Sequence, residues 1–111
     1  MDKKMNTEIN YEFQDGDTCK MTLTFYKLYQ LRAKNPGLYK KYATTINKGK
    51  NIEELDMITI MYTAYACANM DDTTMSEEEF MIKCGSDRTA IMNAYKVLTQ
   101  PKKQTDSGEC S

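Results

Sequence analysis

The sequence predicts a mostly helical α+β fold, in which an N-terminal β-hairpin and about five helices surround a central buried helix. Three observations lead to this prediction. Residues 9–23 alternate between apolar and polar side chains, which is the period of a half-buried strand. Residues 57–70 carry no charge, and several later segments repeat apolar residues at helical spacing. A chain of 111 residues is long enough to form one modest core.

The globular domain is predicted to span residues 8–100. Residues 1–7 are mostly polar and precede the first strand pattern, so we expect a flexible N-terminus. After Pro101 the sequence consists mainly of small and polar residues. We therefore expect a disordered tail over residues 101–111.

The hairpin is predicted for residues 8–23. Each strand has an apolar residue at every second position, namely Ile9, Tyr11 and Phe13 in the first and Cys19, Met21 and Leu23 in the second. Asp15-Gly16-Asp17 is typical of a turn, because glycine adopts positive φ without strain. Two strands alone are marginally stable in water. The hairpin must therefore pack against helices or a second subunit.

Two helices are predicted between Thr24 and Lys50. Thr24 is the expected N-cap of the first, and the residue before Pro36 should end it. Pro36 itself suits the first turn of the second helix, which we expect to end at Lys48-Gly49-Lys50. The apolar positions follow helical spacing at Phe25, Leu28 and Leu31 in the first helix and at Leu38, Tyr42 and Ile46 in the second.

The uncharged run from Met57 to Met70 is the predicted central helix. It is longer than a typical strand of about 5–6 residues and shorter than the roughly 20 apolar residues that span a membrane. A helix that is apolar nearly all round must be covered by the rest of the fold. Asn51 and Glu54 have the spacing of a capping box, so we expect the helix to cover about residues 52–70.

Two more helices are predicted after the central one. Ser76 and Glu79 form a second capping-box pattern, and Gly85 is the expected end of that short helix, which should bury Phe80 and Cys84. Ser86 or Asp87 should begin the last helix, and Pro101 should stop it. Its apolar stripe comprises Ile91, Ala94, Tyr95 and Leu98.

The residue types present argue against catalysis and against metal or cofactor binding. The chain has no histidine, which removes the usual general base. Its four cysteines lie far apart, without a C-x-x-C pair, and are expected to be free thiols, with Cys67 in the core. The acidic residues near 71–79 lack the spacing of a calcium loop. We therefore expect no enzyme activity, no cofactor and no metal.

Charge is distributed unevenly, although the net charge is only −1. Residues 20–50 contain eight bases and no acid, whereas residues 71–79 contain five acids and no base. If the fold held these regions apart, copies of the chain would join head to tail. We therefore predict a homo-oligomer in which Lys40 and Lys41 of one copy contact Glu77 and Glu78 of the next.

Several segments together resemble the tail assembly chaperones of long-tailed phages and prophages of Gram-positive bacteria. They are Leu38-Tyr39-Lys40-Lys41-Tyr42, the helical run 56–70, Met75-Ser76-Glu77-Glu78-Glu79-Phe80 and Pro101-Lys102-Lys103, and the resemblance covers about residues 6–103. It implies a small, non-enzymatic helical protein of the host cytoplasm. Such a protein binds the tape measure protein, keeps it soluble, helps tail tube protein assemble around it, and is absent from the mature virion.

A partner-binding surface is expected to include aromatic and methionine side chains. The candidates are Phe25, Tyr29, Tyr39, Tyr42 and Met61. Methionine is abundant, with nine residues, and its flexible side chain suits surfaces that accept variable partners. The alternative is a small nucleic-acid-binding regulator that uses the basic segment 20–50. The pI of the whole chain, near 5.5, argues against this alternative, because the pI of nucleic-acid-binding domains usually exceeds about 9.

Overall fold

The structure is a computed structural model that describes residues 8–72 and 75–99. The predicted N-terminal segment 1–7 and tail 101–111 lie outside these residues. A hairpin of β1 (Ile9–Glu12) and β2 (Thr18–Met21) comes first. Five α-helices follow within the described ranges, namely α1 (Phe25–Lys34), α2 (Pro36–Ile46), α3 (Glu54–Ala68), α4 (Glu77–Cys84) and α5 (Arg88–Thr99). The predicted fold class, α+β and mostly α, is confirmed.

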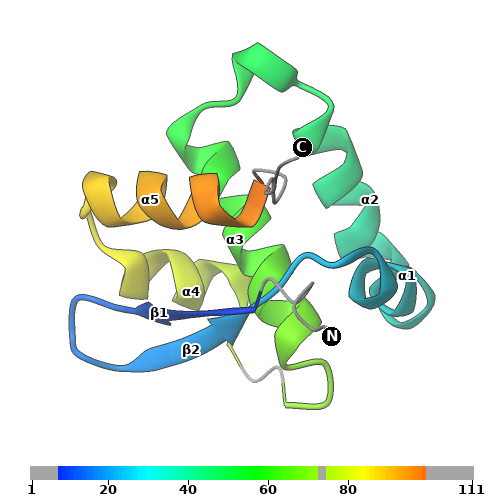
Figure 1. The fold of residues 1–111 in the computed structure, drawn as a ribbon, viewed down its shortest axis with the longest axis horizontal. Helices are drawn as coiled ribbons and strands as arrows, with labels where there is room; N and C mark the ends of the chain where they lie inside the picture. The colour runs from blue at the N-terminus through cyan, green and yellow to red at the C-terminus, as the bar shows by residue number, and fades with distance from the viewer. Residues whose placement is uncertain (1–7, 73–74, 100–111) are drawn as a thin grey trace, which may run out of the picture.

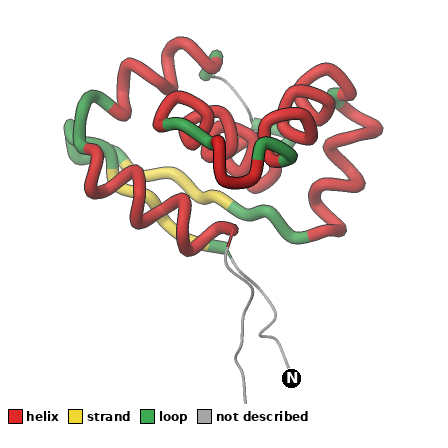
Figure 2. Tube along the Cα trace, turned by 90° about the horizontal axis from the view of Figure 1, so that it is seen from above, coloured by secondary structure: helices red, strands yellow, loops and turns green. Residues whose placement is uncertain are grey.

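Helix α3 is the element on which the others pack. It contacts β2, α1, α2, α4 and α5, and nine of its fifteen residues are buried. The hairpin, α4 and α5 lie on one side of it, and α1 and α2 lie on the other (Figures 1 and 2). The uncharged run therefore forms the predicted central helix, because its side chains are covered from two sides.

The two sides of α3 bury separate apolar clusters. The large core joins α3 to the hairpin, α4 and α5, and the small core joins it to α1 and α2. Phe80 is fully buried at the centre of the large core, with the rings of Phe13, Tyr62 and Tyr65 at centroid distances of 5.6–5.7 Å. The small core contains the buried residues Leu28, Leu31, Ala66 and Cys67.

The hairpin is antiparallel, with Ile9 paired to Met21 and Glu12 to Thr18. Gly16 in its turn has a φ of +93°, as predicted from the Asp-Gly-Asp sequence. The hairpin is held on the helices at both ends. The backbone N–H of Thr22 donates to the carbonyl of Ala64 at 3.1 Å, and Lys83 Nζ lies 2.7 Å from both Asp15 Oδ2 and Asp17 Oδ2.

Most predicted helix ends are confirmed. Thr24 accepts a hydrogen bond from the backbone of Lys27, and Ser76 and Glu79 form their reciprocal capping box. Asp87 Oδ1 accepts from the backbone N–H of Ala90 at 3.1 Å, so Asp87 caps α5.

The predicted start of α3 is wrong. Asn51 belongs to a short 3₁₀ helix, η2 (Gly49–Asn51), and the N-cap of α3 is Glu53, whose backbone is extended. Asp56 Oδ2 accepts from the backbone N–H of Glu53 at 3.0 Å, and Lys48 pairs with the same carboxylate. The chain therefore enters α3 two residues later than predicted, because the acid one turn into the helix provides the cap.

Candidate partner-binding surface

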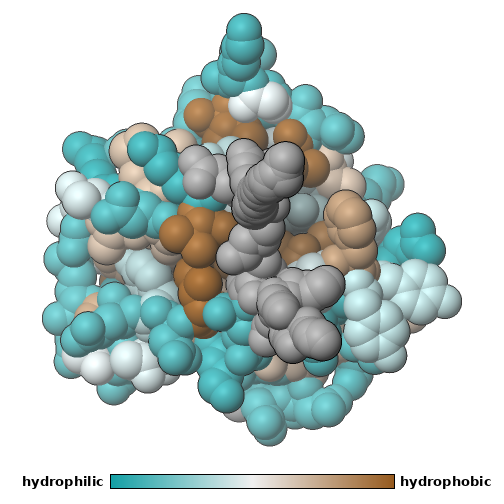
Figure 3. All heavy atoms as spheres, viewed as in Figure 1, coloured by the Kyte–Doolittle hydropathy of each residue, from teal (hydrophilic) through white to brown (hydrophobic). Residues whose placement is uncertain are grey.

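Helix α1 presents its aromatic residues to solvent. Its buried positions are Leu28 and Leu31, which enter the small core. Three aromatic residues of its first half, Phe25, Tyr26 and Tyr29, are 90%, 66% and 63% exposed. We call these three residues the aromatic face. Pale ring-shaped side chains project in Figure 3 at the corner where Figure 1 places α1.

The exposure of Phe25 has an energetic consequence. Burying a phenylalanine side chain is worth about 1.5–3 kcal/mol, and the fold leaves nearly all of this contribution unrealised at Phe25. Single exposed apolar residues are normal, but adjacent large ones that form a patch indicate an interaction site. The aromatic face is therefore our candidate for partner binding.

Basic side chains lie beside Tyr29 of the aromatic face. Residues 25–46, which form α1 and α2, contain five bases and no acid. The guanidinium of Arg32 lies 5.7 Å from the ring centroid of Tyr29 and 5.9 Å from that of Tyr39, within the range of a cation–π interaction. Tyr29 also borders a shallow hollow whose other lining residues are Lys27, Gln30, Ala33, Lys34, Met70 and Asp71.

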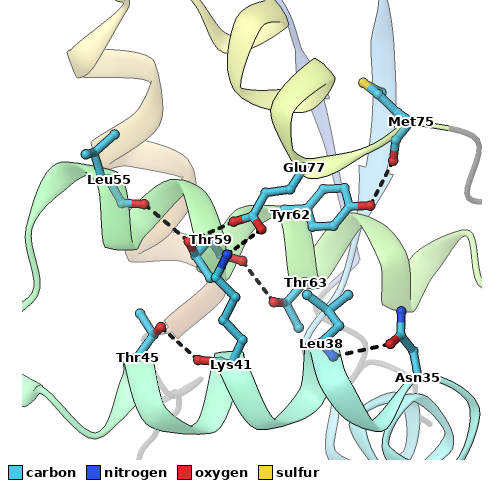
Figure 4. A network of polar contacts seen from close by, with 10 residues as sticks. All are labelled: Asn35, Leu38, Lys41, Thr45, Leu55, Thr59, Tyr62, Thr63, Met75 and Glu77. Atoms are coloured by element: carbon cyan, nitrogen blue, oxygen red, sulfur yellow. Dashed lines mark hydrogen bonds and ion pairs between the residues drawn. The ribbon is translucent and has the colours of Figure 1, made fainter.

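Two of these bases pair with acids of the same molecule. Lys34 pairs with Asp71, and this hydrogen bond lowers the pKa of the Asp71 carboxyl. Lys41 Nζ lies 2.7 Å from Glu77 Oε1, and the hydroxyl of Thr59 donates to Glu77 Oε2 at 2.9 Å (Figure 4). Glu77 at the start of α4 is therefore tied to both α2 and α3.

These ion pairs correct the reasoning behind the predicted head-to-tail contact. That reasoning required the basic and acidic regions to be held apart, but packing of α2 and α4 against α3 brings Lys41 and Glu77 together inside one molecule. Lys40 and Glu78, the other two predicted contact residues, are exposed. The oligomer itself stays a prediction.

The predicted partner-binding residues have different environments. Phe25 and Tyr29 lie on the aromatic face, together with Tyr26, which was not among them. Tyr39 and Tyr42 are partly buried against the small core, and burial raises the pKa of Tyr42. The prediction that Met61 reaches a surface is wrong, since it is fully buried in the large core. The reason is that α3 is covered on two sides and has no free face at this position.

Further exposed apolar side chains lie singly on other helices, including Met92 and Val97 on α5. Leu55 is 63% exposed and Ile82 is 70% exposed. Leu55 lines a shallow pocket with Ile58 and Ile91 between α3 and α5, and the ion pair between Arg88 and Glu54 lies at its rim. These residues belong to different elements, and the base beside Leu55, Arg88, is already paired with Glu54.

The described cysteines are free thiols in protected environments. Burial raises the pKa of Cys67 and Cys84 to about 12 each and that of Cys19 to about 11. Such thiols stay protonated at neutral pH and are poor nucleophiles. Across residues 8–72 and 75–99, no group of three metal-ligating acids or cysteines comes together. No helix in these ranges is both long and apolar enough to cross a membrane.

Comparison of the chain with protein families, with curated proteins and with solved structures finds no match.

Proposed function

We propose that the chain is a tail assembly chaperone of a long-tailed phage or prophage. It binds the tape measure protein, keeps it soluble in the host cytoplasm, promotes assembly of tail tube protein around it, and does not remain in the mature virion. The single observation that carries the proposal is the aromatic face of α1, which offers a non-catalytic binding surface. The resemblance described above selects the partner.

The chemistry of the chain supports binding over catalysis. The chain lacks histidine, and its described thiols are held protonated by burial. A chaperone for a long helical protein requires an apolar contact surface with a charged border. Phe25, Tyr26 and Tyr29 provide the first, and the bases of α1 and α2 provide the second.

Co-expression with a tape measure protein encoded in the same phage or prophage genome tests this function. The wild-type chain should raise the soluble fraction of the tape measure protein and co-purify with it. The double variant Phe25→Ser/Tyr29→Ser should lose both effects, because it removes the two aromatic rings in line along α1 while leaving both cores intact.

A matched control is Leu55→Ser/Ile82→Ser, which removes two similarly exposed apolar side chains elsewhere. This control should keep the tape measure protein soluble, and circular dichroism should show the wild-type helix content in both double variants. A tape measure protein that is equally soluble with and without the wild-type chain contradicts the proposed function.

A further inference from the structure

We infer that the aromatic face binds an acidic amphipathic helix, and that Arg32 is the residue that contacts the partner's carboxylates. This inference rests on the proposed function and specifies which segment of the partner the chaperone recognises. It depends on the shape of the α1 surface, on the charges left unpaired there, and on the geometry of Arg32.

The shape of the surface favours a helix as the partner. Phe25, Tyr29 and Arg32 are separated by four and three residues, so they form one stripe along the ten-residue helix α1. Ala33, which is also exposed, lies beside this stripe and lets a partner backbone approach. A stripe of this kind packs best along the apolar row of a second helix.

The charges that remain unpaired favour a partner with acidic residues. Lys34 and Lys41 are engaged by Asp71 and Glu77. Arg32 and Lys27 form no ion pair with any acid in the part of the chain that the structure describes, although the charge of Lys27 contributes to the lowered pKa of Asp71. A basic partner helix would place like charges together at this surface. A partner with Asp or Glu beside its apolar row would neutralise them.

Arg32 is already oriented for carboxylate binding. Its guanidinium lies near the rings of both Tyr29 and Tyr39, which limits the positions that the long side chain adopts. An arginine held in this way loses less entropy when it binds, and its planar fork donates two parallel hydrogen bonds to one carboxylate. The aromatic rings and the cation therefore act as one site, with apolar contact at Phe25 and charge pairing at Arg32.

The test uses two labelled peptides of about 20 residues, long enough to form a helix on binding. Both carry the same row of leucines, flanked by glutamates in one and by lysines in the other. Fluorescence anisotropy with the full chain should show at least roughly tenfold tighter binding of the glutamate peptide at low salt, and a weaker preference near 1 M salt. Because the whole chain has a net charge of −1, general attraction does not favour the acidic peptide.

Two variants assign the effect to the proposed site. Phe25→Ser should weaken binding of the glutamate peptide roughly tenfold, as expected for an apolar anchor at the centre of an interface. Arg32→Glu should abolish the preference for the glutamate peptide or reverse it. Lys50→Glu is the control, because it reverses an exposed charge in η2, at the far end of α2 from α1 (Figure 1), and should leave the preference unchanged.

Equal binding of the two peptides, or a preference that survives Arg32→Glu, overturns the inference. Tighter binding of a 30-nucleotide DNA than of the glutamate peptide, lost in Arg32→Glu, also overturns it and supports nucleic-acid binding instead. If Arg32→Glu still solubilises the tape measure protein as well as wild type does, the proposed function stands and only the acidic-helix inference fails. If wild type does not solubilise it, the function fails whatever the peptides show.

Discussion

Gly85 joins α4 to α5 in a conformation that other residues rarely adopt. Its φ is +62° and its ψ is −131°, and a Cβ there would lie 1.6 Å from Oε1 of Gln14. That amide oxygen accepts a hydrogen bond from the backbone N–H of Ser86. A side chain at position 85 would therefore strain the backbone and displace the Gln14 side chain that joins the hairpin to the connection between α4 and α5.

We predict that Gly85→Ala lowers the free energy of unfolding by about 1–3 kcal/mol, the usual strain for such a backbone position. Gly37→Ala is the matched control. Gly37 lies in the first turn of α2, where a Cβ would meet only the Asn35 side chain at an ordinary 3.8 Å, so its substitution should be neutral or slightly stabilising. Urea unfolding followed by circular dichroism measures both, and equal stabilities of the two variants would contradict the assigned role of Gly85.

Individual side chains also show where sequence reasoning succeeds and fails. Cys67 and Phe80 are buried as predicted. Cys67 lies in a helix that is apolar nearly all round, and Phe80 is the large aromatic residue of a short helix that begins with three acids. Met61 was placed at a surface because methionine is common on binding surfaces. Its burial follows from the covering of α3 on two sides, which the uncharged run 57–70 indicates for the helix as a whole. The exposure of Tyr26 was not predicted, although the predicted N-cap Thr24 is correct, because Tyr26 lies outside the apolar spacing of Phe25, Leu28 and Leu31.

At the scale of elements, the hairpin is fastened to α4 by Lys83. Its ammonium group bridges Asp15 and Asp17 and lies 5.2 Å from the ring centroid of Phe13. The hydrogen bond from Lys83 is the main reason why the pKa of Asp15 is below its ordinary value, and the backbone N–H of Asp17 lowers it further. The folded state therefore holds this carboxylate charged more strongly than the unfolded chain does.

The sign of the pH dependence follows from this pKa. Folding lowers the pKa of Asp15, so its contact with Lys83 stabilises the fold fully above the unfolded pKa of about 3.9. This stabilisation is lost as the pH falls through the lower pKa of the folded state. We predict that urea unfolding midpoints of the wild type fall between about pH 5 and pH 2, and that Lys83→Met reduces this fall. Part of this fall should remain in the variant, because folding also lowers the pKa values of Asp56 and Asp71.

Lys96→Met, on α5, is the control for this experiment, since Lys96 is exposed and none of the described acids pairs with it. Its midpoints should follow those of the wild type across the pH range. If the unfolding midpoints of Lys83→Met and of the wild type fall in parallel with pH, the hydrogen bond from Lys83 to Asp15 contributes nothing to the pH dependence.

The elements themselves were largely predictable, because capping and turn signals depend on residues within four positions of each other. Thr24, Ser76, Gly16 and Asp87 all act as their local sequence indicates. At the start of α3, Glu53 and Asp56 compete with Asn51 to cap the helix N-terminus. The ion pair with Lys48 favours Asp56. Local pattern alone does not decide such a competition.

At the scale of the whole molecule, the pairing of Lys41 with Glu77 was beyond sequence reasoning, because these residues are 36 positions apart. Only the packing of α2 and α4 on the same stretch of α3 brings them together. The same limit applies to the aromatic face. Its residues are visible in the sequence, but their exposure follows from which side of α1 enters the small core.

We predict that head-to-tail association depends on Lys40 and Glu78, the two contact residues that are exposed and form no ion pair in the part of the chain that the structure describes. Sedimentation velocity at micromolar concentration and low salt should show species larger than a monomer. Lys40→Glu should dissociate them through like-charge repulsion, and Lys40→Glu/Glu78→Lys should restore them by exchanging the charges of the pair. A single monomeric species for the wild type at low salt would refute the prediction.

The position of α3 in the chain also has a consequence for biosynthesis. The hairpin, α1 and α2 are all made before α3, yet β2, α1 and α2 use it as their packing support. A nascent chain halted before residue 54 would expose the apolar residues of three elements at once. The ion pairs of Lys83 with Asp15 and Asp17 form later still, because they require α4. The polypeptide therefore acquires its architecture only after α3 and α4 have been made, and a product truncated before them would expose apolar surface and be prone to aggregation.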